Sequence, residues 1–141
     1  MDFAVERTIN AGAAQVWALL SDAQRYPSWN PTVVSLRGRI ADGERIELVS
    51  TANPKRTFKL KVSGVEPERR MVWQGGMPFG LFRGVRTFSL RPLSDSETVF
   101  SIREDYSGAL AWLITRTIPD MTDAFAKFAD CLRAAAEGNG G

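Results

Sequence analysis

The chain has 141 residues, of which 44% are hydrophobic and 24% charged, and its formal net charge is +2. These proportions are typical of one globular domain with a core of its own. The sequence has no histidine and a single cysteine, Cys131, which excludes Ser-His-Asp and Cys-His relays and a zinc site of the cysteine and histidine kind. Any catalysis must use carboxylates, lysine, arginine, tyrosine, hydroxyl groups or the lone thiol.

Charge and hydropathy narrow the expected partners. Lys59 and Lys61 come nearest to a basic stripe, but they alternate with Phe58, Leu60 and Val62, as on the solvent face of a half-buried strand. We therefore expect no nucleic-acid partner. No apolar run approaches the ~18 residues of a membrane span, so we expect no integral membrane contact. The acidic N-terminus and the unpaired cysteine favour a cytoplasmic location.

The chain is expected to begin with a strand and two short helices. Alternation over residues 2–10 predicts the strand, and residues 13–20 combine helix formers with an apolar face. Residues 21–26 predict a second short helix, which Pro27 and Pro31 are expected to end.

In the middle of the chain, apolar and polar residues alternate with a period of two. Short turns rich in glycine, proline, asparagine and aspartate divide it, which predicts consecutive antiparallel hairpins. The expected strands span residues 33–40, 44–50, 56–66, 69–76, 82–92 and 97–107.

The last element is predicted as one amphipathic helix over residues 109–136, because apolar residues recur there at three- and four-residue steps. Pro119 predicts a kink or break just before it. Residues 137–141 are expected to be a frayed tail. Without an internal repeat or a low-complexity linker, residues 1–141 are expected to form a single domain.

This order of elements favours an α+β fold in which a curved, seven-stranded antiparallel sheet wraps around the long C-terminal helix. That helix is the one predicted element long enough to cover the apolar face of the sheet. Where a curved sheet and a single helix diverge, a cavity lined by inward side chains is expected, and function is expected there.

Several segments resemble the SRPBCC superfamily, the START and Bet v 1-like helix-grip proteins, and in particular its polyketide cyclase/dehydrase-like branch. They are Ala14–Asp22, Tyr26–Pro31, Arg70–Trp73, Phe88–Pro92, Thr98–Phe100 and Glu104–Gly108. The resemblance implies a deep apolar cavity between sheet and helix. Members include lipid and hormone carriers, ubiquinone-binding proteins, aromatic polyketide cyclases and co-chaperone-like proteins. Some relatives have a histidine in the late-strand motif, and an acid–base scheme that depends on it does not transfer to this chain.

One charged pair is predicted to face the cavity. A hairpin turn centred on Asp95 sets Arg86 opposite Glu104, with the same parity as Phe88 and Leu90 on the concave face. The functional interpretation is a polar anchor for a ligand, or catalysis with Glu104 as proton carrier and Arg86 as its partner. The alternative is a structural ion pair near the cavity rim.

The alternation that places Arg86 and Glu104 on the concave face also predicts which apolar side chains line the cavity. Plain core packing is the alternative for these residues, and an aromatic ligand stacked on Trp73 is the more specific hypothesis. The candidate ligand-binding residues are Tyr26, Phe58, Leu60, Met71, Trp73, Phe88, Leu90, Phe100, Ile102, Ile114, Ile118 and Met121.

Residues 75–82 form a glycine-rich hairpin tip that carries four large apolar side chains: Met77, Phe79, Leu81 and Phe82. Such a tip is typical of a gate or contact surface, so we predict a lid over the cavity mouth. The alternative is that the tip packs on the N-terminal part of the long helix, near Trp112.

Three functions remain open. The first is a carrier or sequestering protein, a monomer or weak homodimer, for a hydrophobic, cyclic or aromatic small molecule, with no cofactor and no metal. The second is a cyclase- or dehydratase-like lyase or isomerase, in which Glu104 moves a proton and Arg86 stabilises an enolate. The third is a co-chaperone-like module that binds a protein through the sheet edge or the hairpin tip.

Overall fold

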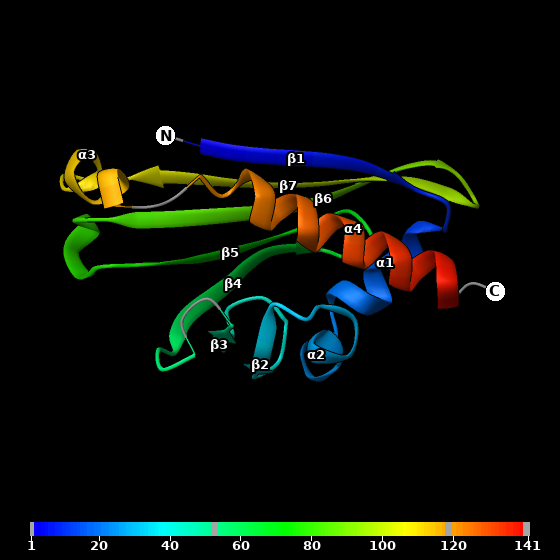
Figure 1. The fold of residues 1–141 in the computed structure, drawn as a ribbon, viewed down its shortest axis with the longest axis horizontal. Coiled ribbons are helices and arrows are strands. Elements are labelled where there is room, and N and C mark those ends of the chain that lie inside the picture. Colours follow the sequence, from blue (N-terminus) through cyan, green and yellow to red (C-terminus); the bar gives the residue numbers. More distant parts are fainter. Residues whose placement is uncertain (1, 52–53, 118–119, 140–141) are drawn as a thin grey trace.

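The computed structural model describes residues 2–51, 54–117 and 120–139. Within them, seven strands form one antiparallel sheet that curls around a C-terminal helix (Figure 1). This is the α+β helix-grip architecture predicted from the sequence. The strands are β1 (Asp2–Ile9), β2 (Val33–Arg37), β3 (Arg45–Ser50), β4 (Phe58–Glu66), β5 (Arg70–Gly76), β6 (Arg83–Ser94) and β7 (Glu97–Ser107).

The strand order across the sheet is β1-β7-β6-β5-β4-β3-β2. Strands β2 to β7 are therefore consecutive hairpins, as predicted, and β1 pairs with the last of them. The β6–β7 ladder has the expected register, with Arg86 opposite Glu104 and Phe88 opposite Ile102. Its one irregularity lies beside the turn, after Pro92, and does not change which side chains face the concave side.

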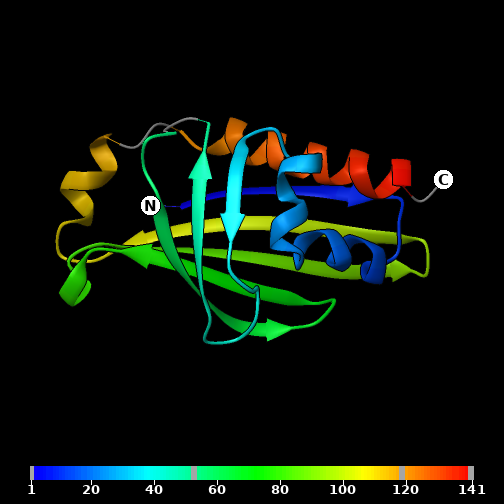
Figure 2. The same cartoon turned by 90° about the horizontal axis from the view of Figure 1, so that it is seen from below.

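Short helices connect β1 to β2 and lie beneath the C-terminal half of the last helix (Figure 2). They are α1 (Ala13–Leu20), the 3-10 turn η1 (Ala23–Arg25) and α2 (Tyr26–Trp29). The expectation that Pro27 ends the helical segment is wrong, because Pro27 lies in the first turn of α2. A first-turn residue has no intrahelical N–H bond to lose.

The C-terminal region is not one continuous helix, which corrects the prediction for residues 109–136. The predicted break falls at Ile118 and Pro119, which lie outside the described residues. Three helical pieces are described: α3 (Ala111–Ile114), the 3-10 turn η3 (Thr115–Thr117) and α4 (Thr122–Asn139).

Helix α4 also extends beyond the predicted tail boundary at residue 137 and continues to Asn139. The backbone N–H of Asn10 donates to a carboxylate oxygen of Glu137 at 2.8 Å. This bond joins the last turns of the helix to the end of β1, and fraying of the tail stays a prediction.

An aromatic cluster joins α4 to the sheet. The ring of Phe128 on α4 lies 5.4 Å from Trp29, 5.7 Å from Phe88, 6.1 Å from Phe100 and 6.2 Å from Tyr26, centroid to centroid. One side chain of the helix thus contacts α2, β6 and β7, and the packing of all three depends on it.

Replacing Phe128 by alanine is expected to lower the free energy of unfolding by about 3–5 kcal/mol, the usual cost of deleting a buried aromatic ring. Phe128 is only 7% exposed. Urea denaturation measures the change. The neighbouring Lys127→Ala, at an exposed position of the same helix, is the control and should change stability by less than about 0.5 kcal/mol. Equal effects of the two variants would contradict the central role of Phe128.

Candidate functional site

Helix α4 covers only part of the concave face of the sheet. Its 18 residues span about 27 Å, whereas the 12 residues of β6 span about 40 Å. In Figure 1, α4 lies over the part of the sheet near α1, and the strands extend beyond its N-terminus toward α3. The concave face therefore has a covered and an uncovered part.

We call these parts the closed half and the open half. In the closed half, concave-face side chains are buried: Ile46, Val62, Met71, Trp73, Phe88, Leu90, Phe100 and Ile102. In the open half, they are only partly buried: Phe3, Leu48, Phe58, Leu60, Arg86, Glu104 and Tyr106.

The charged pair predicted from the register lies in the open half. Glu104 Oε2 accepts two hydrogen bonds from Arg86, from Nη2 at 2.8 Å and from Nε at 3.2 Å. The side chain of Arg86 is 20% exposed and that of Glu104 13% exposed. The guanidinium carbon of Arg86 lies 5.0 Å from the ring centroid of Phe125 on α4. Both bonds use the same carboxylate oxygen, Oε2, and Glu104 also forms a hydrogen bond with the side chain of Tyr106.

Tyr106 and Gly84 complete this polar cluster. Tyr106 stacks on Phe82 at 5.7 Å and meets Phe3 edge-on at 6.2 Å. A Cβ atom at Gly84 would lie 3.2 Å from Glu104 Oε1 and 3.4 Å from the Tyr106 ring. The glycine therefore leaves the room that the carboxylate and the phenol occupy. Burial, and then the neighbouring Glu104 charge, raise the pKa of Tyr106 to about 12.

The register around Asp95 that sets Arg86 opposite Glu104 also sets Gly84 opposite Tyr106, but neither Gly84 nor Tyr106 was a predicted site residue. The available signal was that Gly84 and Tyr106 lie two positions from Arg86 and Glu104 on the same strands, and therefore on the same face of the sheet. Phe125 was assigned only to an amphipathic helix, because sequence spacing does not tell which strand residue a helix residue will meet.

Seven of the candidate ligand-binding residues lie in the packed interior: Tyr26, Met71, Trp73, Phe88, Leu90, Phe100 and Ile102. The Tyr26 hydroxyl donates to the carbonyl oxygen of Leu20 at 2.6 Å, and burial raises its pKa well above the ordinary value. A ligand would have to compete with that bond to use the hydroxyl. Contact between a ligand and these seven residues stays a prediction.

Four others are partly buried: Phe58, Leu60, Ile114 and Met121. Phe58 and Leu60 belong to the open half, and Met121 packs at the edge of the core. The remaining candidate, Ile118, lies outside the described residues.

Two indole N–H groups in the interior have no acceptor among the described residues, Trp29 Nε1 and Trp73 Nε1. The ring of Tyr26 contacts both indoles, at 4.8 and 5.8 Å. A buried donor without a partner costs about 1–3 kcal/mol. Both are donors that an acceptor oxygen in the interior would satisfy.

The predicted lid contains the 3-10 turn η2 (Pro78–Gly80), which places the ring of Phe79 in solvent. The backbone N–H of Leu110 donates to the carbonyl oxygen of Leu81 at 2.8 Å. The tip thus contacts the segment just before α3, whereas packing of its side chains near Trp112 stays a prediction. Its movement as a lid stays a prediction.

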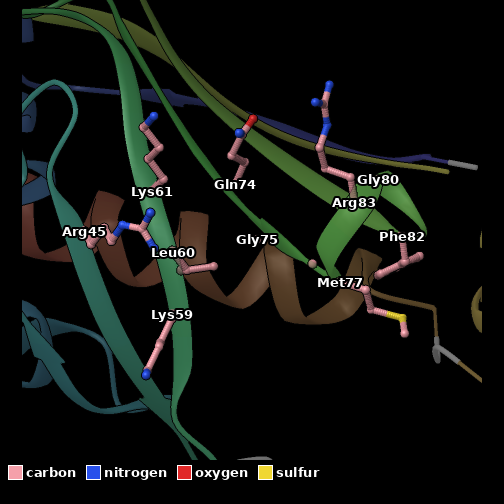
Figure 3. Close-up of a pocket in the computed structure, with 11 residues that line it drawn as sticks. Arg45, Lys59, Leu60, Lys61, Gln74, Gly75, Met77, Gly80, Phe82 and Arg83 are labelled. Carbon is pink, nitrogen blue, oxygen red and sulfur yellow. The ribbon is translucent and has the colours of Figure 1, made fainter.

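The described residues also form two hollows of about 390 Å³ each. The first contains three of the candidate site residues, Leu60, Met77 and Phe82, beside several cationic side chains (Figure 3). The second contains Ile102 and is otherwise lined by residues of β1, β6 and β7 such as Thr87 and Ser101.

Two other kinds of feature are missing from the part of the chain that the structure describes. No three acidic or cysteine side chains gather there as a metal-binding group. No helix there has both the length and the apolar character needed to cross a membrane.

Residues 1–137 match the family model described as "Polyketide cyclase / dehydrase and lipid transport". Solved structures with similar folds include the Zhui aromatase/cyclase from Streptomyces, at 12% identity and a TM-score of 0.78, covering 100% of this chain and 96% of that one. A norcoclaurine synthase from Thalictrum shares 16% identity at a TM-score of 0.75, with the same coverage. A START superfamily protein from Mycobacterium smegmatis shares 17% identity at a TM-score of 0.73, covering 98% of both chains. No curated protein matches the chain in sequence.

The raised pKa values of Tyr26 and Tyr106 can be tested directly, because these are the two tyrosines of the chain. At about pH 11 an ordinary tyrosine is mostly ionised, whereas the folded protein is expected to show little tyrosinate absorbance. The folded state keeps protons that the unfolded state releases, so stability should fall as the pH rises from about 10 toward 12. Full ionisation near pH 10, with the circular dichroism of the folded state intact, would contradict the burial of both hydroxyls.

Proposed function

We propose a ligand-binding function for this chain, which belongs to the polyketide cyclase / dehydrase and lipid transport family. The ligand is a hydrophobic, cyclic or aromatic small molecule, bound between the sheet and α4 with its polar end in the open half of the concave face. The protein acts as its carrier or sequestering protein.

The observation that carries the proposal is the half-buried Arg86–Glu104 pair, set among aromatic side chains where α4 does not cover the sheet. A charged pair in such a position is costly unless its remaining donors and acceptors are used. Arg86 has N–H groups beyond the two that bond Glu104, and Oε1 of Glu104 accepts neither of those bonds. A ligand with a carbonyl oxygen and a hydroxyl group matches these groups.

Affinity would come from apolar contact. Phe58 and Leu60 from β4, and Phe3 from β1, are partly exposed on this face, and covering them releases about 25 cal/mol per Å². The Arg86–Glu104 pair would orient the ligand, since hydrogen bonds to ionised groups are strong and directional.

A cyclase- or dehydratase-like reaction is the second candidate. It is favoured by the position of Tyr106, whose hydroxyl lies close enough to Glu104 for the carboxylate charge to raise its pKa. In this alternative Glu104 moves the proton and Arg86 stabilises developing negative charge on an oxygen of the substrate.

Native mass spectrometry of the purified protein, together with a fluorescence titration with 1-aminoanthracene, tests ligand binding. The wild-type protein is expected to bind the probe. Gly84→Leu should weaken binding at least about tenfold, because the new side chain enters the space beside Glu104 and Tyr106. The control is Val85→Leu, at the next position, whose side chain faces the other side of the sheet. A wild-type protein that carries no ligand and does not bind the probe would contradict the proposal.

Glu104→Gln separates the carrier from a dehydratase. The amide keeps the shape of the side chain but cannot take up a proton. If the protein is a carrier, the molecule that co-purifies with the variant should have the same mass as that from the wild type. A co-purifying molecule heavier by one water would identify a dehydratase and overturn the carrier assignment. Circular dichroism of the variant checks that its fold is unchanged.

A further inference from the structure

Exposed apolar side chains are concentrated at one end of the molecule. Large hydrophobic residues are exposed at seven positions among the described residues, and five of these belong to two neighbouring segments. Phe79 is 98% exposed and Trp112 63% exposed. We call these five residues the apolar tip: Met77, Phe79, Leu81, Trp112 and Leu113.

The two segments of the apolar tip are joined by their backbones. Leu110 donates to the carbonyl oxygen of Leu81 at 2.8 Å, and a Cβ atom at Gly108 would lie 2.7 Å from the carbonyl oxygens of Gly80 and Leu81. Gly108 also has a φ of +113°, which other residues rarely adopt. Only glycine therefore permits this approach. Figure 1 shows η2 and α3 side by side at the end of the sheet away from the C-terminus.

The exposure of Phe79 is unfavourable for the isolated chain. Its φ of 61° and ψ of 23° lie in the left-handed region, which costs free energy for any residue other than glycine. The ring gains no burial in return, because it is almost fully exposed. Strained positions of this kind are concentrated at functional sites.

Positive charge lies beside the apolar tip. The guanidinium carbon of Arg116 is 5.2 Å from the ring centroid of Trp112. The first hollow includes Met77 and Gly80 together with cationic side chains and no acidic one (Figure 3). We call its cations the basic hollow: Arg45, Lys59, Lys61 and Arg83.

The basic hollow has little opposing charge in the part of the chain that the structure describes, where Glu47 on β3 stands opposite Lys59 but forms no ion pair with it. Among the described residues, none of its four side chains takes part in an ion pair, whereas Arg39, Arg86 and Arg103 do. Arg45 and Lys61 stand directly opposite each other on β3 and β4. Like charges in that position repel, and an external anion would relieve the repulsion.

We infer that the apolar tip and the basic hollow dock the protein on an anionic phospholipid surface. Phe79, Trp112 and the neighbouring aliphatic side chains enter the boundary between headgroups and acyl chains, while the cations contact lipid phosphates. A bilayer fits better than a folded protein partner, because the tip projects outward. A Cβ atom at Gly80 would meet nothing within 4 Å, and a convex apolar projection suits a fluid, deformable surface. The inference goes beyond ligand binding and does not require it.

Co-sedimentation with lipid vesicles tests the inference. The wild-type protein is expected to bind vesicles made from three parts phosphatidylcholine and one part phosphatidylglycerol at least about tenfold more tightly than vesicles of phosphatidylcholine alone, and less tightly as salt is added. The double variant Phe79→Ser/Trp112→Ser should lose most of this binding. Lys59→Gln/Lys61→Gln should lose the preference for anionic lipid. Leu93→Ser is the matched control, since Leu93 is an exposed apolar residue in the β6–β7 hairpin outside the tip.

A second measurement uses the wild-type protein and one conservative variant of the apolar tip. Brominated phosphatidylcholine in the anionic vesicles should quench the tryptophan fluorescence of the wild-type protein. Trp112→Phe should remove most of the quenching, because the other tryptophans are more buried. Lack of vesicle binding by the wild-type protein would overturn the inference. Equal loss of binding in Leu93→Ser and in the tip variant would do so too, as would self-association through the tip without vesicle binding.

Discussion

The structure depends on a mismatch of length between the sheet and the helix that covers it. Helix α4 spans about 27 Å, and the longest strand spans about 40 Å. The helix can therefore bury one half of the concave face and must leave the other half partly exposed. The aromatic cluster around Phe128 fills the covered half, whereas the Arg86–Glu104 pair lies where the cover ends, against Phe125 in the first turns of α4. The mismatch separates the part that stabilises the fold from the part available to a ligand.

Much of the fold was predictable from the sequence, because alternation and turn residues act locally. The β6–β7 register follows from a two-residue period and one turn, so the pairing of Arg86 with Glu104 was predicted and is confirmed. The final segment was predicted as one helix with a kink or break before Pro119, because three- and four-residue spacing continues across that point, whereas the structure has the separate pieces α3, η3 and α4. The division into open and closed halves was also out of reach. It depends on where α4 begins over the sheet, and no local pattern encodes that position.

The candidate site, like the fold, was predictable from the sequence only where a local pattern determines it. Parity alone placed Tyr106 and Gly84 beside the charged pair, but the contact with Phe125 and the unpartnered indoles of Trp29 and Trp73 arise from packing between distant segments. The hairpin tip was recognised as unusual from its composition. Its left-handed Phe79 and its backbone contact with Gly108 needed the three-dimensional structure. In this account one end of the sheet serves two purposes, with the ligand groups on its concave face and the membrane-docking surface at its tip.

Methyl NMR during a titration with 1-aminoanthracene tests the central claim most directly, because it reports where on the concave face the ligand lies. The account expects shifts at Leu60, in the open half, and at Met121, just before α4. It expects none at two fully buried residues, Ile9 at the end of β1 and Leu132 on α4. Shifts confined to Ile9 and Leu132, or confined to surface methyl groups such as that of Val34, would contradict it.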